Sequence, residues 1–241
     1  LKLAFIGKLV FGKFKLSLNI FFRLLIRKVY PNAETSSIDQ TIISIHLTID
    51  FSYNNAVESI RIFSTTKKFN NDLTTPMAAY LRLNQPDAFF LESVEKGETI
   101  GRYSMIGLEP LIKVQGYKDY MTLIKAEDRQ IIDGNPLTLL NELYKNMSHE
   151  KQGEAPVSIG FFGHFRWDVI EAIEAIKLRG ENQLLFEFQI PKKLIVFDHA
   201  MQSIHISITD FSSVSGHDEM KHILHKIQQP LEAAKFSSIV E

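Results

Sequence analysis

The stretch FFLESVEKGETIGRYSMIG, residues 89–107, decides how the central part of this chain folds. Two apolar runs, FFL and YSMI, flank a polar segment that contains EKGE. Apolar runs on either side of a short polar turn are typical of two strands joined as an antiparallel hairpin. The stretch also raises a question, because the carboxylate of Glu92 and the hydroxyl of Ser93 follow directly on a strand that is predicted to be buried.

Further strands and helices are predicted on both sides of this hairpin. The predicted strands are LIKVQGY (111–117), YMTLIKA (120–126), VSIGFFGHF (157–165), and two within LIVFDHAMQSIHISI (194–208), joined at 199–202. The predicted helices are MAAYLRL (77–83), PLTLLNELYKNM (136–147), FRWDVIEAIEAIKLRG (165–180) and a last one after residue 215 that Pro230 bends or ends. Successive strands and helices without regular βαβ alternation favour an α+β fold, with antiparallel sheets and helices packed on them.

The N-terminal part of the chain differs in composition from the rest. Residues 1–33 contain seven basic residues and no acidic one, and a basic amphipathic helix fits their pattern as well as a segment without a role. The alternation of residues 42–51 predicts a strand, and residues 54–63 fit a short helix. The polar segment 66–76, within TTKKFNNDLTTP, predicts a loop. We therefore predict an unassigned extension over 1–65 and a main domain over 66–241.

Composition excludes several classes of protein. The chain has 241 residues, a net charge of −1 and no cysteine. The absence of cysteine excludes disulfides and thiolate zinc sites, and the near-neutral charge gives no basis for a nucleic-acid partner. No uninterrupted apolar run reaches the roughly 18 residues of a membrane span, so we expect no membrane partner.

Three further motifs partly match known nucleotide-binding or metal-binding patterns. GKLVFGKF (7–14) has the glycines and lysine of a phosphate loop but lacks the hydroxyl that would hold magnesium. His217, His222 and His225 form a possible metal cluster, and Glu171 with Glu174 a possible carboxylate pair. Each of these two groups also fits the solvated face of a helix, so we predict no metal site and no catalytic residue in this chain.

Physical chemistry allows two interpretations of how the carboxylate of Glu92 is neutralised. A carboxylate at the end of a buried strand needs a positive partner or a proton, because an unpaired buried charge is costly. Arg102 lies just beyond the turn and would provide that partner within the hairpin. Alternatively the ammonium group of a ligand would neutralise Glu92, and Ser93 would add a hydrogen bond.

A family resemblance bears on this choice. The segment 89–110 resembles the Leu-Glu-Ser and Gly-Arg-Tyr-Ser-x-Ile-Gly patterns of the N-terminal domain of anthranilate synthase component I, a chorismate-utilising enzyme. TTPMAAYLRL (74–83) is similar to the Thr-Pro-Val-x-x-Tyr lead-in of that family. SIGFFGHFRWDVIEAIE (158–174) and LIVFDHAMQSIHI (194–206) are similar to its Gly-Gly-x-x-Gly-Tyr and Val-Phe-Asp-His segments. The four segments keep the family's order and spacing over about residues 66–210.

The resemblance implies a function for the hairpin. In the family, the complete enzyme converts chorismate and glutamine to anthranilate, pyruvate and glutamate in tryptophan biosynthesis, and tryptophan inhibits it by feedback. Carried over to this chain, the tryptophan-binding residues are Leu91, Glu92, Ser93 and, past the turn, Arg102. Glu92 would face the ammonium group of L-tryptophan, and a charge-assisted contact of this kind contributes about 1.5–3 kcal/mol.

The resemblance also sets expectations about partners and cofactors. The family's magnesium and chorismate sites lie in a C-terminal catalytic domain whose motifs are absent from this sequence, so we expect no cofactor in this chain and Mg²⁺ only in the complete enzyme. The expected partners are L-tryptophan, a separately encoded catalytic domain and the glutamine amidotransferase component II, and the expected location is cytoplasmic.

Some residues depart from the family pattern. Ile159 stands at one glycine of the Gly-Gly pair, His164 and Trp167 stand at the tyrosines, and Glu171 stands at a common arginine. The substituted glycine favours one alternative, a decayed fragment without function. The other alternative is the N-terminal domain of aminodeoxychorismate synthase component I, because its fold is shared and its leader motifs overlap with those quoted.

Overall fold

The structure, a computed structural model, describes residues 57–71, 74–83, 85–92, 101–172, 184–213 and 215–230. The chain divides into two compact units, which are interleaved along the sequence. Unit 1 takes its described residues from 57–60, 112–147 and 160–189, and unit 2 takes its described residues from 61–111, 148–159 and 190–230. Two long strands, β3 (Tyr103–Gly116) and β8 (Phe186–Asp198), contribute residues to both units.

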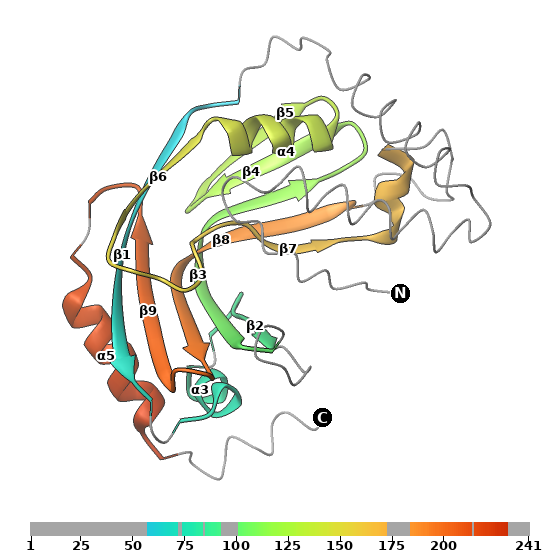
Figure 1. Ribbon diagram of the computed structural model, residues 1–241. Helices are drawn as coiled ribbons and strands as arrows, with labels where there is room; N and C mark the ends of the chain where they lie inside the picture. Colours follow the sequence, from blue (N-terminus) through green and yellow to red (C-terminus); the bar gives the residue numbers. More distant parts are fainter. Residues whose placement is uncertain are drawn as a thin grey trace, which may run out of the picture. The chain divides into compact units, whose positions relative to one another are not determined.

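Unit 1 is built on antiparallel strands with one helix against them. Its strands follow the order β5 (Asp128–Asp133), β4 (Tyr120–Lys125) and β3, and β7 (Phe162–Phe165) pairs with β8. The helix α4 (Pro136–Lys145) packs against β4 (Figure 1), and its buried residues include Leu139, Leu140 and Leu143. Asn135 caps this helix, because its side-chain oxygen accepts hydrogen bonds from the backbone of Leu137 and Thr138.

Unit 2 holds the other strands, in the order β3, β8, β9 (Ser203–Asp210), β1 (Ile60–Asn70) and β6 (Met147–Gln152). The short strand β2 (Phe89–Glu92) pairs with β3 in an antiparallel ladder that places Leu91 opposite Met105 and Glu92 opposite Ser104. This is the hairpin-like pairing that the opening stretch predicts, with residues 93–100 between its strands outside the described residues.

Two helices cover one face of the unit 2 strands. The helices α3 (Pro76–Leu83) and α5 (His217–Gln228) pack on each other, and α5 lies along β9 (Figure 1). Arg82 of α3 donates a hydrogen bond to the carbonyl of Ile227, so the first helix caps the last turn of the second. The buried core between helices and strands includes Ile106, Leu108, Ile195, Phe197, Ile204, Ile206, Ile208, Met220, Ile223 and Ile227.

The structure confirms the α+β fold class and several elements. The helices predicted at 77–83 and 136–147 correspond to α3 and α4, and the turn predicted at 199–202 separates β8 from β9. The last helix ends at Gln228, shortly before Pro230, as a residue without a backbone N–H requires.

Other predictions were wrong in detail. The residues assigned to a loop at 66–70 and to a helix at 60–63 form β1, because the backbone of the polar run TTKKFN pairs with β9 from Phe63 to Asn70. Residue 66, the predicted start of the main domain, therefore lies within a strand. The strands predicted at 102–108 and 111–117 form the single strand β3, whose chain bends at Glu109, where φ is 52°.

The region after residue 156 also differs from its prediction. The strand expected over 157–165 is limited to Phe162–Phe165, and the described part of the helix expected over 165–180 is a 3₁₀ helix, η1 (Trp167–Ala172). Residues 1–56 of the extension predicted over 1–65, with the strand at 42–51 and the phosphate-loop-like motif, lie outside the described residues. Within the described ranges, no helix combines the length and apolar character that crossing a membrane requires.

Candidate functional site

Three segments of the sequence meet at one corner of unit 2. The end of β2 supplies Glu92, the start of β3 supplies Arg102 and Ser104, and the end of β8 supplies Asp198 and His199. These segments contain the Leu-Glu-Ser, Gly-Arg-Tyr-Ser and Val-Phe-Asp-His patterns identified in the sequence. The fold therefore brings together segments that are distant in the sequence, and the Arg102–Asp198 contact alone spans 96 residues. We name this set the strand-end corner.

An ion pair between Arg102 and Asp198 holds the corner together. The guanidinium of Arg102 donates from Nε to Oδ1 of Asp198 at 3.0 Å and from Nη2 to Oδ2 at 2.8 Å. The Oδ1 atom also accepts hydrogen bonds from the backbone N–H groups of Ala200 and Met201, which close the turn between β8 and β9. Asp198 is 4% exposed, so one buried carboxylate both fixes the arginine and shapes the turn.

The hydrogen bonds to Asp198 also set its ionisation. Burial by itself raises the pKa of a carboxyl group, but the hydrogen bonds from Arg102 and from the backbone of Met201 and Ala200 outweigh burial and lower the pKa of Asp198 below its usual value. The same contact raises the pKa of Arg102. Both groups are therefore charged at neutral pH.

A second contact joins β3 to the turn after β8. The Oγ atom of Ser104, which is fully buried, lies 2.8 Å from Nε2 of His199. The backbone N–H of His199 donates to the carbonyl oxygen of Arg102 at 2.9 Å. Ser104 is thus fixed directly opposite Glu92 in the β2–β3 ladder.

Glu92 itself is exposed at the end of β2. No described residue is recorded within hydrogen-bond or ion-pair distance of its carboxylate, and Arg102, the partner expected within the hairpin, binds Asp198 instead. A solvated carboxylate needs no internal partner, which explains why the sequence argument from burial did not apply. Among the described residues, Glu92 therefore has no cationic partner.

Glycines explain the spacing of the Gly-Arg-Tyr-Ser-x-Ile-Gly pattern. Gly101 has φ 92°, a conformation that side chains with a Cβ rarely adopt. At Gly107, a Cβ atom would lie 2.1 Å from the ring of Phe89, which packs directly over the glycine in the opposite strand. The first glycine permits the entry into β3, and the second lets β2 lie close to it.

The apolar predicted residue Leu91 lies on the opposite face of β2 from Glu92. It is half-buried and stands opposite Met105, whereas Phe90 points to the helix-covered core and stacks on Tyr80 with ring centroids 5.4 Å apart. Ser93 lies outside the described residues. Of the four residues predicted to bind tryptophan, the structure thus describes Leu91, Glu92 and Arg102.

The sequence-based prediction did not include Asp198 and His199 in the site. The Val-Phe-Asp-His segment that was matched to the family contains both residues, so the signal was present. Only the three-dimensional pairing of β3 and β8 shows that they contact Arg102 and Ser104.

The other candidate clusters show no site among the described residues. His217 contacts the carbonyl of Ser215 and His225 contacts Gln229, both on the exposed side of α5. Asp168 forms an ion pair with Arg166 at 3.5 Å, while Glu174 lies outside the described residues. No group of three His, Cys, Asp or Glu side chains within the described ranges is arranged to hold a metal ion.

Comparison with known proteins points to one group of relatives. The chain is 28% identical over 169 residues to anthranilate synthase component 1 of Acetivibrio thermocellus, covering 67% of this chain and 34% of that protein. It is 34% identical over 107 residues to the Synechocystis sp. protein of the same name, covering 43% of this chain and 21% of that protein. The Neisseria meningitidis serogroup B protein of that name is 29% identical over 173 residues, with 66% and 35% covered.

The chain thus spans about a third or less of the length of these relatives. A crystal structure of anthranilate synthase component I from Streptococcus pneumoniae matches 65% of this chain and 35% of its own, with 23% identity and a TM-score of 0.40. No protein-family model matches the chain.

Proposed function

We propose that this chain, which is related to anthranilate synthase component 1 over about two thirds of its length, is the N-terminal regulatory part of such an enzyme and binds L-tryptophan at the strand-end corner. The complete enzyme would convert chorismate and glutamine to anthranilate, with a component II as the glutamine amidotransferase partner. Tryptophan would inhibit it by feedback from this site.

The observation that carries the proposal is the exposed Glu92 carboxylate beside a neutralised arginine. Because Asp198 binds Arg102, the arginine does not draw Glu92 into an internal ion pair. Glu92 can then accept hydrogen bonds from the ammonium group of an amino acid. Leu91 and Met105 stand opposite each other on the other face of the ladder, so they would contact only a part of the ligand that reaches around the strand end.

Arg102 has a second use in this proposal. Its guanidinium carries five N–H donors, and the two hydrogen bonds to Asp198 use two of them. The remaining three have no recorded acceptor among the described residues and suit the carboxylate group of an amino acid. One corner would thus offer an acceptor for the ammonium group and donors for the carboxylate group of the same ligand.

Calorimetry with L-tryptophan tests the proposal. The chain should be titrated alone and after mixing with the C-terminal two thirds of the related Acetivibrio thermocellus protein, because a second domain would complete the site. We expect saturable heat from the unchanged chain. Glu92→Gln should weaken the affinity for tryptophan at least about tenfold, because it removes one charge-assisted contact. Glu127→Gln, an exposed carboxylate in unit 1, is the matched control and should bind like the unchanged chain.

Two results would reject the proposal. The first is the absence of heat both from the chain alone and from its mixture with the second domain. The second is equal tryptophan affinity of the Glu92→Gln and Glu127→Gln variants.

A further inference from the structure

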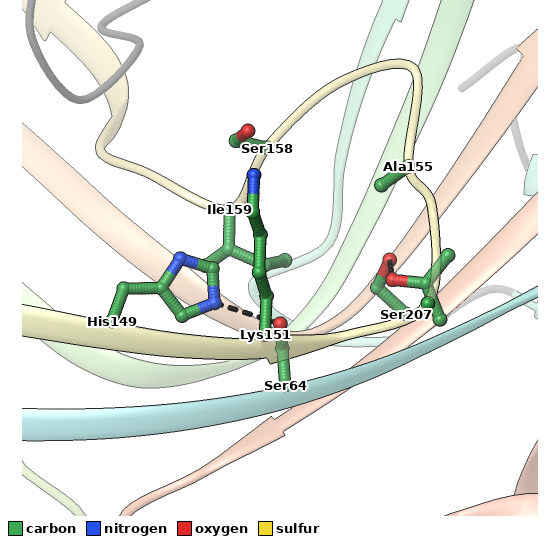
Figure 2. A pocket seen from close by; sticks show the side chains of 9 residues that line it. Ser64, His149, Lys151, Ala155, Ser158, Ile159 and Ser207 are labelled. Carbon is green, nitrogen blue, oxygen red and sulfur yellow. Dashed lines mark hydrogen bonds between the residues drawn. The ribbon is translucent and has the colours of Figure 1, made fainter.

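A polar pocket lies in unit 2 on strands that do not form the corner. Its floor is made by β1 and β9, one side by β6, and its roof by the chain that follows β6 (Figure 2). The polar side chains that line it are Ser64, Thr66, His149, Lys151, Ser158 and Ser207. The cavity has a volume of about 20 Å³, somewhat more than one water molecule needs.

The roof of this pocket is held close to β1. Gly153 has φ 84°, and a Cβ atom there would lie 2.3 Å from the carbonyl oxygen of Thr66, so only glycine lets the chain approach β1 this closely. Val157 and Ile159, each 2% exposed, anchor the far end of the same segment. The pocket is therefore formed by packed chain on both sides.

Hydrogen-bond accounting leaves a donor unused in the pocket. The Oγ1 atom of Thr66 and the Oγ atom of Ser207 lie 2.8 Å apart and share one hydrogen bond. Two hydroxyl groups have two protons, and one hydrogen bond uses only one of them. No described group is recorded as accepting the second proton, which suits an acceptor that enters the pocket.

The charge of the pocket favours an anion. Among the nine residues that line it, His149 and Lys151 are the titratable ones, and neither Asp nor Glu is present. His149 and Lys151 are two residues apart in β6, so both point to the same face, and the Lys151 side chain extends from the strand toward the roof (Figure 2). Glu150 points the other way and lies 3.9 Å from Arg61.

The environment of His149 has the same character. Its Nε2 atom lies 2.7 Å from Oγ of Ser64. Burial, and secondarily the positive charge of Lys151, lower the pKa of His149 below its usual value. A negative charge in the pocket would oppose both influences, because it favours the imidazolium form.

The same sheet face carries other buried polar atoms near the pocket. Within the described residues, Oγ1 of Thr209 is buried without a hydrogen bond, and the ring of His205, also largely buried, lies close to the backbone of Glu154. Both residues alternate with the isoleucines of β9 and so lie on the face of Ser207. Buried polar atoms of this kind indicate ordered water or a polar ligand nearby.

We propose that this pocket binds the carboxylate group of a small molecule. One carboxylate oxygen would accept from the Lys151 ammonium group, and the other would accept from the unused hydroxyl proton of Thr66 or Ser207. Protonated His149 would donate to Ser64, which frees the Ser64 hydroxyl to donate to the ligand. Because the cavity is about the size of one water molecule, one carboxylate oxygen would occupy it and the rest of the ligand would extend through the opening.

The test follows the pKa of His149 by NMR in the full chain labelled on histidine, with acetate as the probe and chloride at equal ionic strength as the reference. His149→Gln identifies the signal. We expect acetate to raise the pKa of His149 saturably, by about one unit, since an opposite charge at contact distance has at least this effect. Lys151→Met should abolish the shift, and Lys118→Met, an exposed lysine in unit 1, should leave it unchanged.

Each other outcome counts against the proposal. If acetate leaves the pKa of His149 at its value in chloride, the pocket holds water only. If inorganic phosphate produces an equal shift that Lys151→Met abolishes, the pocket is a general anion site and the carboxylate assignment is wrong. Neither result tests the binding of tryptophan, which is proposed for a different site. Glu92→Gln should leave the effect of acetate on the pKa of His149 unchanged.

Discussion

The two faces of β9 are equally buried but chemically opposite. Ile204, Ile206 and Ile208 lie on one face and are 0% exposed. Ser203, His205, Ser207 and Thr209 lie on the other, and none is more than 9% exposed. An alternating strand usually has one face exposed to solvent. Here both faces are buried, so the alternation predicts which side chains share a face but does not predict which face is exposed.

Different elements cover the two faces. The helices α3 and α5 bury the isoleucine face by close apolar packing. On the polar face, hydroxyl and imidazole groups bond to one another and to β1 and β6, as in the Thr66–Ser207 and Ser64–His149 contacts. The first face gains stability from buried area. On the second, the paired hydroxyl and imidazole groups avoid the cost of burial without a partner, whereas Oγ1 of Thr209 is buried without a hydrogen bond to any described residue.

The largest expected effect is on the isoleucine face. Ile206→Ala should reduce the free energy of unfolding by about 3 kcal/mol, because it removes buried methyl and methylene groups and leaves a cavity. Urea denaturation followed by circular dichroism measures this loss. The neighbouring Ser207→Ala on the polar face is the matched variant, and a loss as large as that of Ile206→Ala would contradict the distinction between the faces.

The next effect concerns Asp198, which stands opposite Ser203 at the end of β8. Asp198→Asn should reduce the free energy of unfolding by about 2 kcal/mol, since it removes the charge that accepts hydrogen bonds from Arg102 and from the turn. Denaturation at neutral pH measures it, with Asp128→Asn, an exposed carboxylate at the start of β5, as control. Equal stability of the two variants would show that the corner does not depend on this ion pair.

The polar face should also make stability depend on pH. Burial lowers the pKa of His149 and of His205, so each binds a proton more readily in the unfolded chain, where the usual value is 6.5. Their contribution is complete above pH 6.5 and is lost as the pH falls below it, by at most about 1.4 kcal/mol per pH unit for each histidine.

Denaturation at pH 7.5, 6.5 and 5.5 measures this dependence. Two histidines flank the same polar face, so the double variant His149→Gln, His205→Gln should show a flatter profile than the unchanged chain. A profile that is equally steep in the double variant would assign the pH dependence to other groups.

The smallest effect is expected for the hydroxyl pair of Thr66 and Ser207. Ser207→Ala alone should cost about 1 kcal/mol, because it deprives Thr66 of its hydrogen-bond partner. The double variant Thr66→Val, Ser207→Ala should cost less than the sum of the single variants, since both polar groups are then removed. Additive losses in this double-mutant cycle would show that the two hydroxyl groups do not stabilise each other.

The sequence predicted the parts of the fold that depend on local pattern. The leucine stripe and Pro136 predict α4, and the two apolar runs within 194–208 predict two strands joined at 199–202. The strand β1 was not predicted, because Lys67, Lys68 and Asn70 are poor strand residues and their conformation depends on pairing with β9. Local propensity carries no information about that partner.

The candidate site was predicted only as far as its segments. Family patterns led to Glu92 and Arg102, and the nearness of these two residues in sequence suggested that they pair. The structure gives Arg102 a partner 96 residues away, and a contact of this length has no local signal. The polar pocket was missed for the same reason, since Ser64 and His149 are 85 residues apart.

The long separation between Arg102 and Asp198 has a consequence for folding. A contact that closes a loop of 96 residues costs chain entropy before it adds stability, so such contacts form late. During synthesis the β2–β3 ladder can form first, but its arginine has no carboxylate until β8 has left the ribosome. A molecule that binds at this corner would therefore stabilise the finished fold and not an early folding intermediate.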